Sequence, residues 1–267
     1  MCNLPSHTII TTMTDLLRIT QLHKHFGKTP VLQDINLSVA KGEVLGLAGE
    51  SGSGKSTLAL CVAGLHTYDS GEILCNGAPL LTQRTAQNFR QQAQHIQMVF
   101  QDPLSSINPR MTIADTLLEP LRLNKIGTAN EQRAEAEHWM ERIGLRVNDL
   151  QRYPHSFSGG QLQRIGIARA LISKPQLLIC DEPVSALDVT TQAQILELLS
   201  NLRRELGLTL LFISHDLATM RRFCDRIAVM QAGKIVEQGK AAEVLKNPQH
   251  SYTQKLVRSS PLLFSNA

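Results

Sequence analysis

The stretch Val44-Leu45-Gly46-Leu47-Ala48-Gly49-Glu50-Ser51-Gly52-Ser53-Gly54-Lys55-Ser56-Thr57 decides the fold. Its second part, from Gly49 to Thr57, fits the phosphate-binding loop pattern of a glycine, any four residues, a glycine, a lysine and a serine or threonine. The apolar run before it predicts a buried strand, and the residues from Lys55 to Gly64 predict a helix. This strand-loop-helix context is the one that the pattern requires, so the sequence predicts a nucleoside triphosphate site.

The residue types in this loop suit the chemistry of phosphate binding. Glycines allow the backbone to curl so that successive N–H groups point at phosphate oxygens, and the N-terminus of the following helix adds a positive dipole end. Lys55 supplies a positive charge for the β- and γ-phosphates, and the Ser56 hydroxyl can bind Mg²⁺. We expect the triphosphate to bind at Gly49, Glu50, Ser51, Gly52, Ser53, Gly54, Lys55, Ser56 and Thr57. The alternative is a glycine-rich turn ahead of an ordinary helix.

The composition excludes several other classes of protein. The chain has 267 residues, 42% of them hydrophobic, which suits a folded α/β domain with a sizeable core. Its longest apolar runs fall far short of the about 20 residues that a membrane helix needs. The net charge of +4 has no Lys/Arg tract behind it, so we expect no nucleic-acid partner.

Cysteine and histidine give no metal pattern, and the N-terminus gives no signal-peptide pattern. The five cysteines include no Cys-x-x-Cys pair, so neither a zinc site nor a disulfide framework is predicted. His23 and His25 alternate along a predicted strand, and we interpret them as surface residues. Because residues 1–14 lack a basic start followed by a long apolar core, we expect a cytoplasmic chain, with Met1 and Met13 both open as the start.

The order of predicted elements indicates an α/β fold with a mostly parallel central sheet. Short β-rich runs from about Leu16 to Ile73 predict an N-terminal antiparallel layer around the loop. The pattern turns helical from about Thr112 to Leu145, which predicts a helical insertion. After Ser158 helices and strands alternate to the end of the chain. No internal repeat is found, so the chain is expected to contain one nucleotide site.

Two adjacent carboxylates follow a second apolar strand, Leu177 to Cys180. Adjacent side chains on a strand face opposite ways, so Asp181 and Glu182 can hold different tasks. We expect Asp181 to face Mg²⁺ and Glu182 to face the attacking water. The alternative is that both acids merely end a strand.

A further segment combines a hydroxyl N-cap candidate with two glycines just before a helix, which predicts a second helix N-terminus able to receive an anion. This segment, Phe157-Ser158-Gly159-Gly160-Gln161-Leu162-Gln163-Arg164, resembles the signature motif of ATP-binding cassette (ABC) ATPases, with Phe157 where leucine is commoner. Gln101 resembles the family's glutamine-loop residue, Ser185-Ala186-Leu187-Asp188 its D-loop, and His215 its switch histidine. Phe26 stands where the family places an aromatic ring that stacks on adenine.

The resemblance implies a P-loop ABC ATPase cassette that binds ATP and Mg²⁺ and works only as a pair. Glu182, His215 and Gln101 would act in hydrolysis, and Ser56, Gln101 and Asp181 would hold Mg²⁺. Ser158, Gly159, Gly160 and Gln161 would complete the site of the partner cassette, with Asp188 in the D-loop. The implied partners are a second cassette, either a paralogous chain or a second copy, two permease subunits, and a periplasmic or extracellular solute-binding protein. The implied location is peripheral, at the cytoplasmic face of the inner membrane.

The resemblance also predicts a division of the chain. Residues 1–14 would form a disordered extension, 15–240 the ABC ATPase domain with a helical subdomain at about 102–160, and 241–267 a C-terminal helical tail.

Two segments resemble the importers of di- and oligopeptides and of nickel or metal chelates: Gln101 to Arg110, and the tail Asn247-Pro248-Gln249-His250-Ser251-Tyr252-Thr253. The tail has Ser251 where proline is typical, and the chain ends soon after Pro261. These departures favour the nickel or metallophore branch, with a di- or oligopeptide importer as the alternative. A soluble ABC ATPase outside transport and a stand-alone P-loop kinase are further alternatives, and the kinase leaves the signature and D-loop motifs unexplained.

Overall fold

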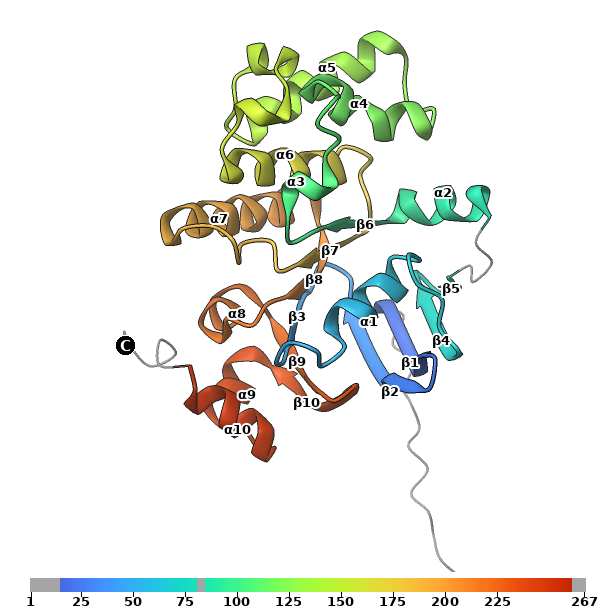
Figure 1. Cartoon of the computed structure of the whole chain (residues 1–267), viewed down its shortest axis with the longest axis vertical. Coiled ribbons are helices and arrows are strands. Elements are labelled where there is room, and N and C mark those ends of the chain that lie inside the picture. Colours follow the sequence, from blue (N-terminus) through green and yellow to red (C-terminus); the bar gives the residue numbers. More distant parts are fainter. Residues whose placement is uncertain (1–14, 81–84, 261–267) are drawn as a thin grey trace, which may run out of the picture.

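A computed structural model describes residues 15–80 and 85–260, so the extension expected at residues 1–14 lies outside the described part. Its main sheet has six strands in the order β10 (Lys234–Lys240), β9 (Arg226–Gln231), β3 (Val44–Ala48), β8 (Thr209–Ile213), β7 (Leu177–Asp181) and β6 (Ile96–Val99). All neighbouring pairs are parallel except β9 and β10 (Figure 1). The mostly parallel central sheet predicted from the sequence is therefore confirmed.

A second, antiparallel sheet lies beside the first, as the sequence predicts. Its order is β2 (Thr29–Ala40), β1 (Asp15–Phe26), β4 (Ser70–Cys75) and β5 (Ala78–Pro79). The helices are α1 (Lys55–Val62), α2 (Ala86–His95), α3 (Pro103–Ser106), α4 (Ile113–Leu123), α5 (Ala129–Arg142), α6 (Gly159–Leu171), α7 (Val189–Leu206), α8 (Leu217–Phe223), α9 (Ala241–Lys246) and α10 (Ser251–Arg258), with 3-10 turns at Val147–Gln151 and Pro154–Ser156. No helix in residues 15–80 and 85–260 is both long and apolar enough to cross a membrane.

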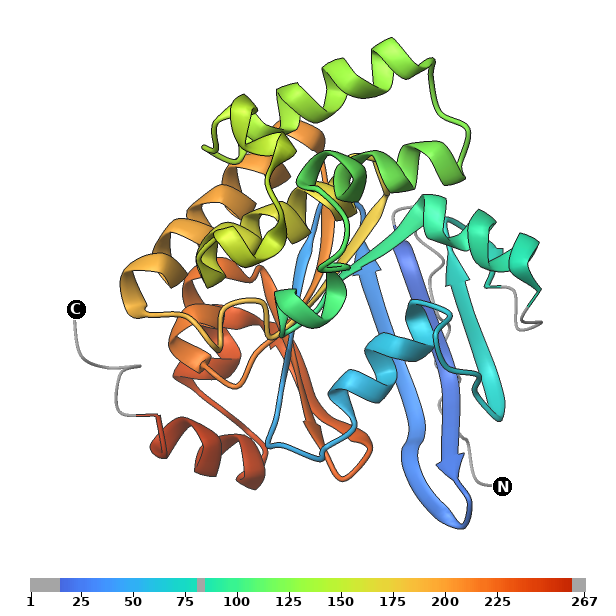
Figure 2. The same ribbon diagram turned by 45° about the horizontal axis from the view of Figure 1, so that its top comes forward.

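Side-chain alternation along the buried strands divides the core in two. On β3, Leu45 and Leu47 face a cluster that contains α1 and both sheets. Val44 and Ala48 face the opposite cluster, which contains α6, α7 and α8. Since successive side chains of a strand point to opposite faces, one strand serves both halves of the core. Helix α1 is thereby held between the two sheets, as Figure 2 shows.

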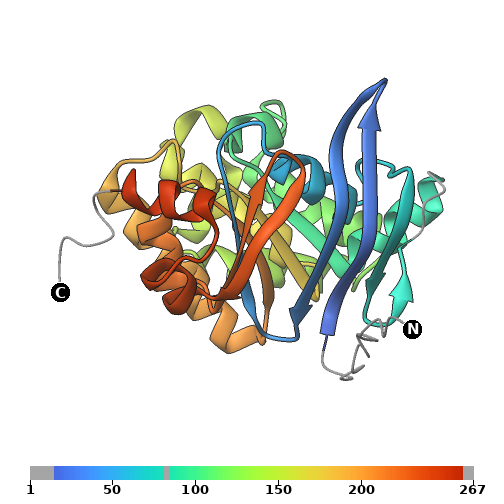
Figure 3. The ribbon, with the colours of Figure 1, turned by 90° about the horizontal axis from the view of Figure 1, so that it is seen from below.

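The helices α4 and α5 lie at the top of Figure 1, and α3 lies below them, packed against α6. The C-terminal helices α9 and α10 lie beside β9 and β10 (Figure 3). Helix α5 begins with a capping box in which Thr128 and Glu131 satisfy each other's backbone N–H groups. The buried side chain of Trp139 joins α5 to the same cluster as α6.

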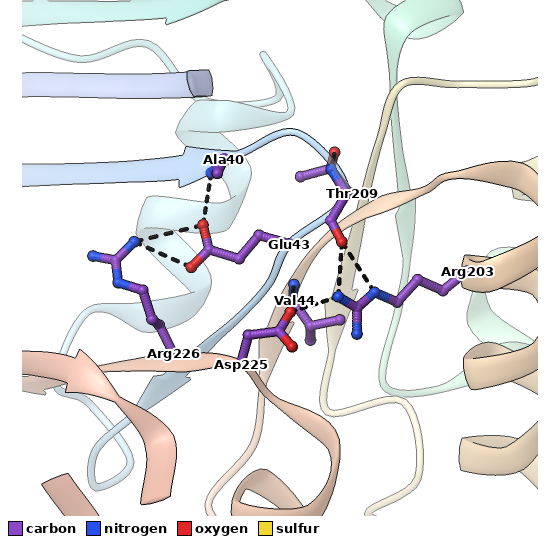
Figure 4. A network of polar contacts seen from close by, with 8 residues as sticks. Ala40, Glu43, Val44, Arg203, Thr209, Asp225 and Arg226 are labelled. Atoms are coloured by element: carbon purple, nitrogen blue, oxygen red, sulfur yellow. Dashed lines mark hydrogen bonds and ion pairs between the residues drawn. The ribbon is translucent and has the colours of Figure 1, made fainter. Parts of the chain in front are cut away.

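A polar network fixes the chain where it enters β3 (Figure 4). The Glu43 carboxylate accepts from the Ala40 N–H at 2.6 Å and pairs with Arg226 at 3.1 Å. Asp225 accepts from the Val44 N–H at 2.8 Å and from Arg203 at 2.6 Å. The side chain of Glu43 is only 8% exposed, so its charge depends on these partners. The network sets the start of the strand that leads into the glycine-rich loop.

Removing the buried carboxylate should destabilise the fold. We expect Glu43→Ala to lower the free energy of unfolding by about 1.5–3 kcal/mol, because it removes charge-assisted hydrogen bonds and leaves Arg226 without its carboxylate partner. Glu243→Ala is the matched control: its pair with Lys240 has both side chains more than 70% exposed, so the loss should stay below about 1 kcal/mol. Urea unfolding of the two variants measures the difference, and equal losses would contradict a structural role for Glu43.

Candidate functional site

The glycine-rich loop joins β3 to α1, as predicted. Gly49 has a φ of +149°, and a Cβ placed on it would lie 2.3 Å from the carbonyl oxygen of Met230 at the end of β9. Gly54, with a φ of +106°, occupies the N-cap position of α1. The curled loop therefore depends on glycine at both of its ends, and its N–H groups lie at the start of a helix, where an anion is favoured.

Lys55 lies inside this loop. Its Nζ donates to the carbonyl oxygens of Gly49 and Glu50, both at 2.8 Å, and its side chain is largely buried. Burial lowers the pKa of Lys55, and the nearby carboxylates of Glu182, Asp181 and Glu50 oppose that effect. Phosphate oxygens are stronger acceptors than carbonyl groups for a lysine, so an arriving triphosphate can take over these hydrogen bonds.

Asp181 and Ser56 meet beside the loop, as the sequence predicts for a magnesium site. The Ser56 hydroxyl donates to Asp181 Oδ1 at 3.3 Å. Burial raises the pKa of Asp181, and the hydrogen bond from Ser56 opposes this rise. The buried Ser53 hydroxyl in the same loop has no hydrogen-bond partner among the described residues. A hydroxyl and a carboxylate next to an unsatisfied polar atom fit an oxygen-liganded Mg²⁺ with phosphate nearby.

The backbone conformation at Glu182 differs from the strand geometry that the sequence predicts. Strand β7 ends at Asp181, and Glu182 has a φ of +46°, in the left-handed region. Its N–H nevertheless donates to the carbonyl oxygen of Ile213 on β8. The sequence predicts simple alternation along a strand, but the strand ends at Asp181 and the backbone turns at Glu182. A left-handed conformation at a residue other than glycine is typical of functional positions.

Glu182, His215 and Gln101 are brought together from three separate segments. His215 Nδ1 lies 3.3 Å from Glu182 Oε2. The Gln101 amide lies 3.4 Å from the same oxygen and donates to the Ser185 hydroxyl at 3.2 Å. Gln101, expected at the metal, thus contacts Glu182 and the D-loop here. Strands β6, β7 and β8 are parallel, so their carboxyl ends place these side chains at one edge of the sheet.

Phe26 ends β1 with 49% of its surface exposed. The ring of His66 packs edge-on against it with centroids 5.5 Å apart, and Lys24 Nζ lies 5.2 Å from the ring centroid. Asp69 fixes the end of β1 next to Phe26, because its carboxylate accepts from the backbone N–H of His25 at 2.6 Å. The result is a supported aromatic face that is open to solvent. His66 and Asp69 were not predicted, because neither belongs to a recognisable motif.

The signature segment forms the start of α6. Ser158 is the N-cap and its side chain accepts from the Gln161 N–H, while the Gln161 side chain accepts from the Ser158 N–H. Gly159 and Gly160 are the first two residues of the helix, whereas we had predicted them before it, because the capping box starts the helix directly after Ser158. Among the described residues, no hydrogen bond joins this segment to the glycine-rich loop.

The D-loop, like the signature segment, contains the N-cap residue of a helix. Asp188 is the N-cap of α7 and accepts from the Thr191 N–H at 3.0 Å and from the Thr191 hydroxyl at 2.6 Å. These hydrogen bonds lower the pKa of Asp188. A Cβ on Gly159 would lie 3.7 Å from Leu187 Cδ2 of the D-loop, and one on Gly160 would lie 2.4 Å from Thr191 Cγ2 in α7, so the D-loop and the signature segment pack together in one chain.

One contact of the loop was not predicted at all. The N–H of Glu50 donates to the hydroxyl of Tyr252, on α10, at 3.0 Å. The tail motif that contains Tyr252 was noticed in the sequence, but nothing in the motif indicates which part of the fold its tyrosine reaches.

Comparisons with known proteins agree with this geometry. The sequence model of the family described as ABC transporter matches residues 32–185. The chain is 44% identical over 252 residues to the oligopeptide transport ATP-binding protein OppF of Bacillus subtilis, covering 92% of this chain and 83% of the relative. Other relatives at 46–47% identity carry the same description.

Solved structures show the same fold. The cbiO1 protein of Clostridium perfringens, described as part of an ABC transporter complex, has a TM-score of 0.80 at 28% identity, and the match covers 94% of this chain and 96% of that protein. A dimeric ATP-binding cassette in a post-hydrolysis state with ADP and phosphate has a TM-score of 0.76 at 28% identity, with 84% of this chain and 98% of the other covered.

The close approach at Gly49 gives a testable prediction. We expect Gly49→Ala to lose about 1–3 kcal/mol more stability than Gly52→Ala, because the added Cβ overlaps the Met230 carbonyl group. Gly52 is the matched control: it also has a positive φ, but no atom lies within 4 Å of its Cβ position. Thermal unfolding of both variants measures the difference. A Gly49→Ala protein as stable as Gly52→Ala would mean that the loop does not need this close approach.

Proposed function

The chain belongs to the ABC transporter family, and we propose that it is the ATP-hydrolysing subunit of an importer for di- or oligopeptides. The observation that carries this proposal is the extensive similarity to ATP-binding proteins described as serving oligopeptide transport. These relatives support the peptide alternative better than the nickel or metallophore interpretation that the tail had favoured. That interpretation relied on Ser251 and on the end of the chain after Pro261, which lies outside the described residues.

The structure explains why Ser251 says little about the substrate. Ser251 is the first residue of α10, a position where proline and serine are interchangeable in geometry because the N–H there has no partner within the helix. Proline at this position would be compatible with the same local geometry, so the structure gives no reason to link Ser251 with either branch.

Nucleotide binding follows from the family, and we propose the individual roles. ATP would bind along Gly49 to Thr57 with its adenine on the exposed face of Phe26. Ser56 and Asp181 would hold Mg²⁺, joined by Gln101 once its amide leaves Glu182. The ion would neutralise charge on the β- and γ-phosphates. Lys55 is already inside the loop at 2.8 Å from two carbonyl oxygens, so only a short movement would bring its ammonium group to the phosphates.

Glu182 is proposed to orient and polarise the attacking water. Its carboxylate is positioned by the turn at its own backbone and by His215 at 3.3 Å. His215 would also steady the γ-phosphate, and its contact with Glu182 would keep both groups on the same side of the nucleotide. Gln101 would report the presence of the nucleotide, since it lies between Glu182 and Ser185 of the D-loop.

We propose that two cassettes pair and complete each other's sites. Ser158 and Gly159 are exposed at the tip of α6, where a helix N-terminus favours a phosphate group. Because they make no contact with the loop of their own chain within the described residues, a second cassette would supply them to each ATP. The dimeric cassette among the similar solved structures supports pairing. The partner would be a paralogous chain or a second copy.

The permease is proposed to dock beside Gln101. A groove of about 460 Å³ lies between α2, β6 and the end of α4, and Phe100 lines it next to Gln101. Phe89 and Leu123 line the same groove and are 46% and 54% exposed. Exposed apolar side chains around a groove are typical of protein–protein contacts. We propose that each of two permease subunits places a cytoplasmic segment here, in a complex completed by a solute-binding protein.

The same reasoning supports a division of the chain by role. Residues 15–240 would form the ATPase domain, the helical part at about 102–160 would carry the signature and permease contacts, and residues 241–267 would form a tail. The whole protein would lie at the cytoplasmic face of the inner membrane as a peripheral subunit.

The catalytic roles can be separated by two substitutions. We expect Glu182→Gln to keep the Kd for ATP within about threefold while kcat falls at least about 100-fold, because the water loses its base. Lys55→Ala should instead weaken ATP binding about 10- to 100-fold, because charge-assisted hydrogen bonds are lost. Nucleotide-binding and phosphate-release assays measure both, with the exposed Glu243→Gln as control. Normal turnover in Glu182→Gln would remove that residue from the role of base.

The imported solute is tested in cells. In a strain that lacks this gene, we expect uptake of a radiolabelled oligopeptide to be lost while uptake of radiolabelled nickel is unchanged. The native gene should restore peptide uptake, and the Glu182→Gln gene should not. Loss of nickel uptake with normal peptide uptake would instead support the nickel branch.

A further inference from the structure

The tail motif from Asn247 to Thr253 folds into a fixed turn that holds α10. Glu237, on β10, accepts from the N–H groups of Gln249 and His250 at 2.8 and 3.0 Å. His250 is the N-cap of α10, and its Nδ1 accepts from the Tyr252 N–H at 3.2 Å. The Glu237 carboxylate thus fixes the two residues before the helix, and the His250 imidazole satisfies one of the free N–H groups of its first turn. The motif orients α10 against the main sheet, beside the glycine-rich loop (Figures 2 and 3).

This orientation buries Tyr252 against the loop. Its side chain is part of the core beneath α8 and α9 and is 7% exposed. Its hydroxyl oxygen accepts the hydrogen bond from the Glu50 N–H, across 202 residues of sequence. Burial raises the pKa of Tyr252, so the hydroxyl is neutral at physiological pH.

The peptide group that Tyr252 holds is the one on which Lys55 rests. That peptide joins Gly49 to Glu50, and its carbonyl oxygen, on Gly49, accepts from Lys55 Nζ at 2.8 Å. The next carbonyl oxygen, on Glu50, also accepts from Lys55 Nζ at 2.8 Å and from the Ser53 N–H at 3.2 Å. On the other side, Gly49 is pressed against the Met230 carbonyl group. The entry to the loop is therefore fixed between β9 and α10, and the peptide between Gly49 and Glu50 is bonded through both its N–H and its oxygen.

We propose that Tyr252 is a positioning residue of the ATP site, which holds the first peptide of the loop in its binding conformation and makes nucleotide affinity depend on the docking of α10. The inference rests on the proposed ATPase function. Tyr252 touches no reacting atom. Its hydrogen bond restricts the loop before ATP arrives, so less conformational freedom is lost on binding.

A cavity of about 500 Å³ extends the contact between α10 and the site. Leu256, Ser259 and Ser260 form one wall, and the loop residues Gly49 to Ser51 and the segment His215–Ala218 form the others. A displacement of α10 would therefore alter the surroundings of the loop and of His215 together.

The test compares two tyrosine hydroxyls in the full-length chain. Tyr252→Phe keeps the ring and removes only the hydroxyl. We expect the Kd for a fluorescent ATP analogue, and the KM for ATP in the assembled transporter, to rise about 3- to 10-fold with kcat within twofold. Hydrogen exchange in the segment containing Glu50 should quicken. Tyr68→Phe is the matched control, because that half-buried hydroxyl bonds the backbone of Ile73 in the antiparallel sheet, and it should change the Kd less than twofold.

Two outcomes would overturn the inference: an unchanged Kd with unchanged exchange at Glu50, or a fall in kcat and thermal stability without a rise in KM, which would indicate a purely structural tyrosine. Lys55→Ala, measured alongside, keeps the two proposals apart. If Lys55→Ala weakens binding and Tyr252→Phe does not, the ATPase stands and the role of Tyr252 falls. If neither affects the Kd, the proposed nucleotide site itself is wrong.

Discussion

The close approach of Gly49 to the carbonyl group of Met230 is the constraint on which the rest of the structure depends. With no room for a Cβ, the chain must leave β3 in a sharp curl that only glycine adopts without strain. The curl delivers Lys55 to the first position of α1, and α1 then buries Leu58 and Val62 between the two sheets. A single backbone contact thus links the phosphate loop to the packing of the core.

The parallel sheet brings the other candidate site residues to the end of β3 where the loop begins. Strands β7 and β8 run beside β3 in the same direction, so Asp181 and the segment before His215 emerge at the edge where the loop lies. At the opposite end of β3, Glu43 and Asp225 hold the chain as it enters the strand. The residues that stabilise the fold therefore lie at one edge of the sheet, and the candidate site residues lie at the other, as expected for open α/β folds.

The sequence best predicts those features that depend on residues adjacent to one another in the chain. The loop, the apolar strands and the cap at Ser158 are local patterns, and their elements could be predicted closely. No local pattern reveals three other features: the left-handed turn at Glu182, the contact of Gln101 with Ser185, and the hydrogen bond from Glu50 to Tyr252. The two contacts join segments that are distant in the sequence. The relatives support the alternative branch, a peptide importer, better than the nickel branch that the tail favoured, and a serine at the first position of α10 is neutral to the fold.

The capping box at the tip of α6 has a consequence for assembly. Ser158 accepts from its own helix through one lone pair, which leaves its hydroxyl hydrogen free for an incoming anion. The capping box holds the tip in its helical conformation without a second chain, so in the proposed pairing little folding would be needed at the contact. If two cassettes pair as proposed, the lifetime of the pair would depend on the charge held between the subunits, and the spent nucleotide would itself be the release signal.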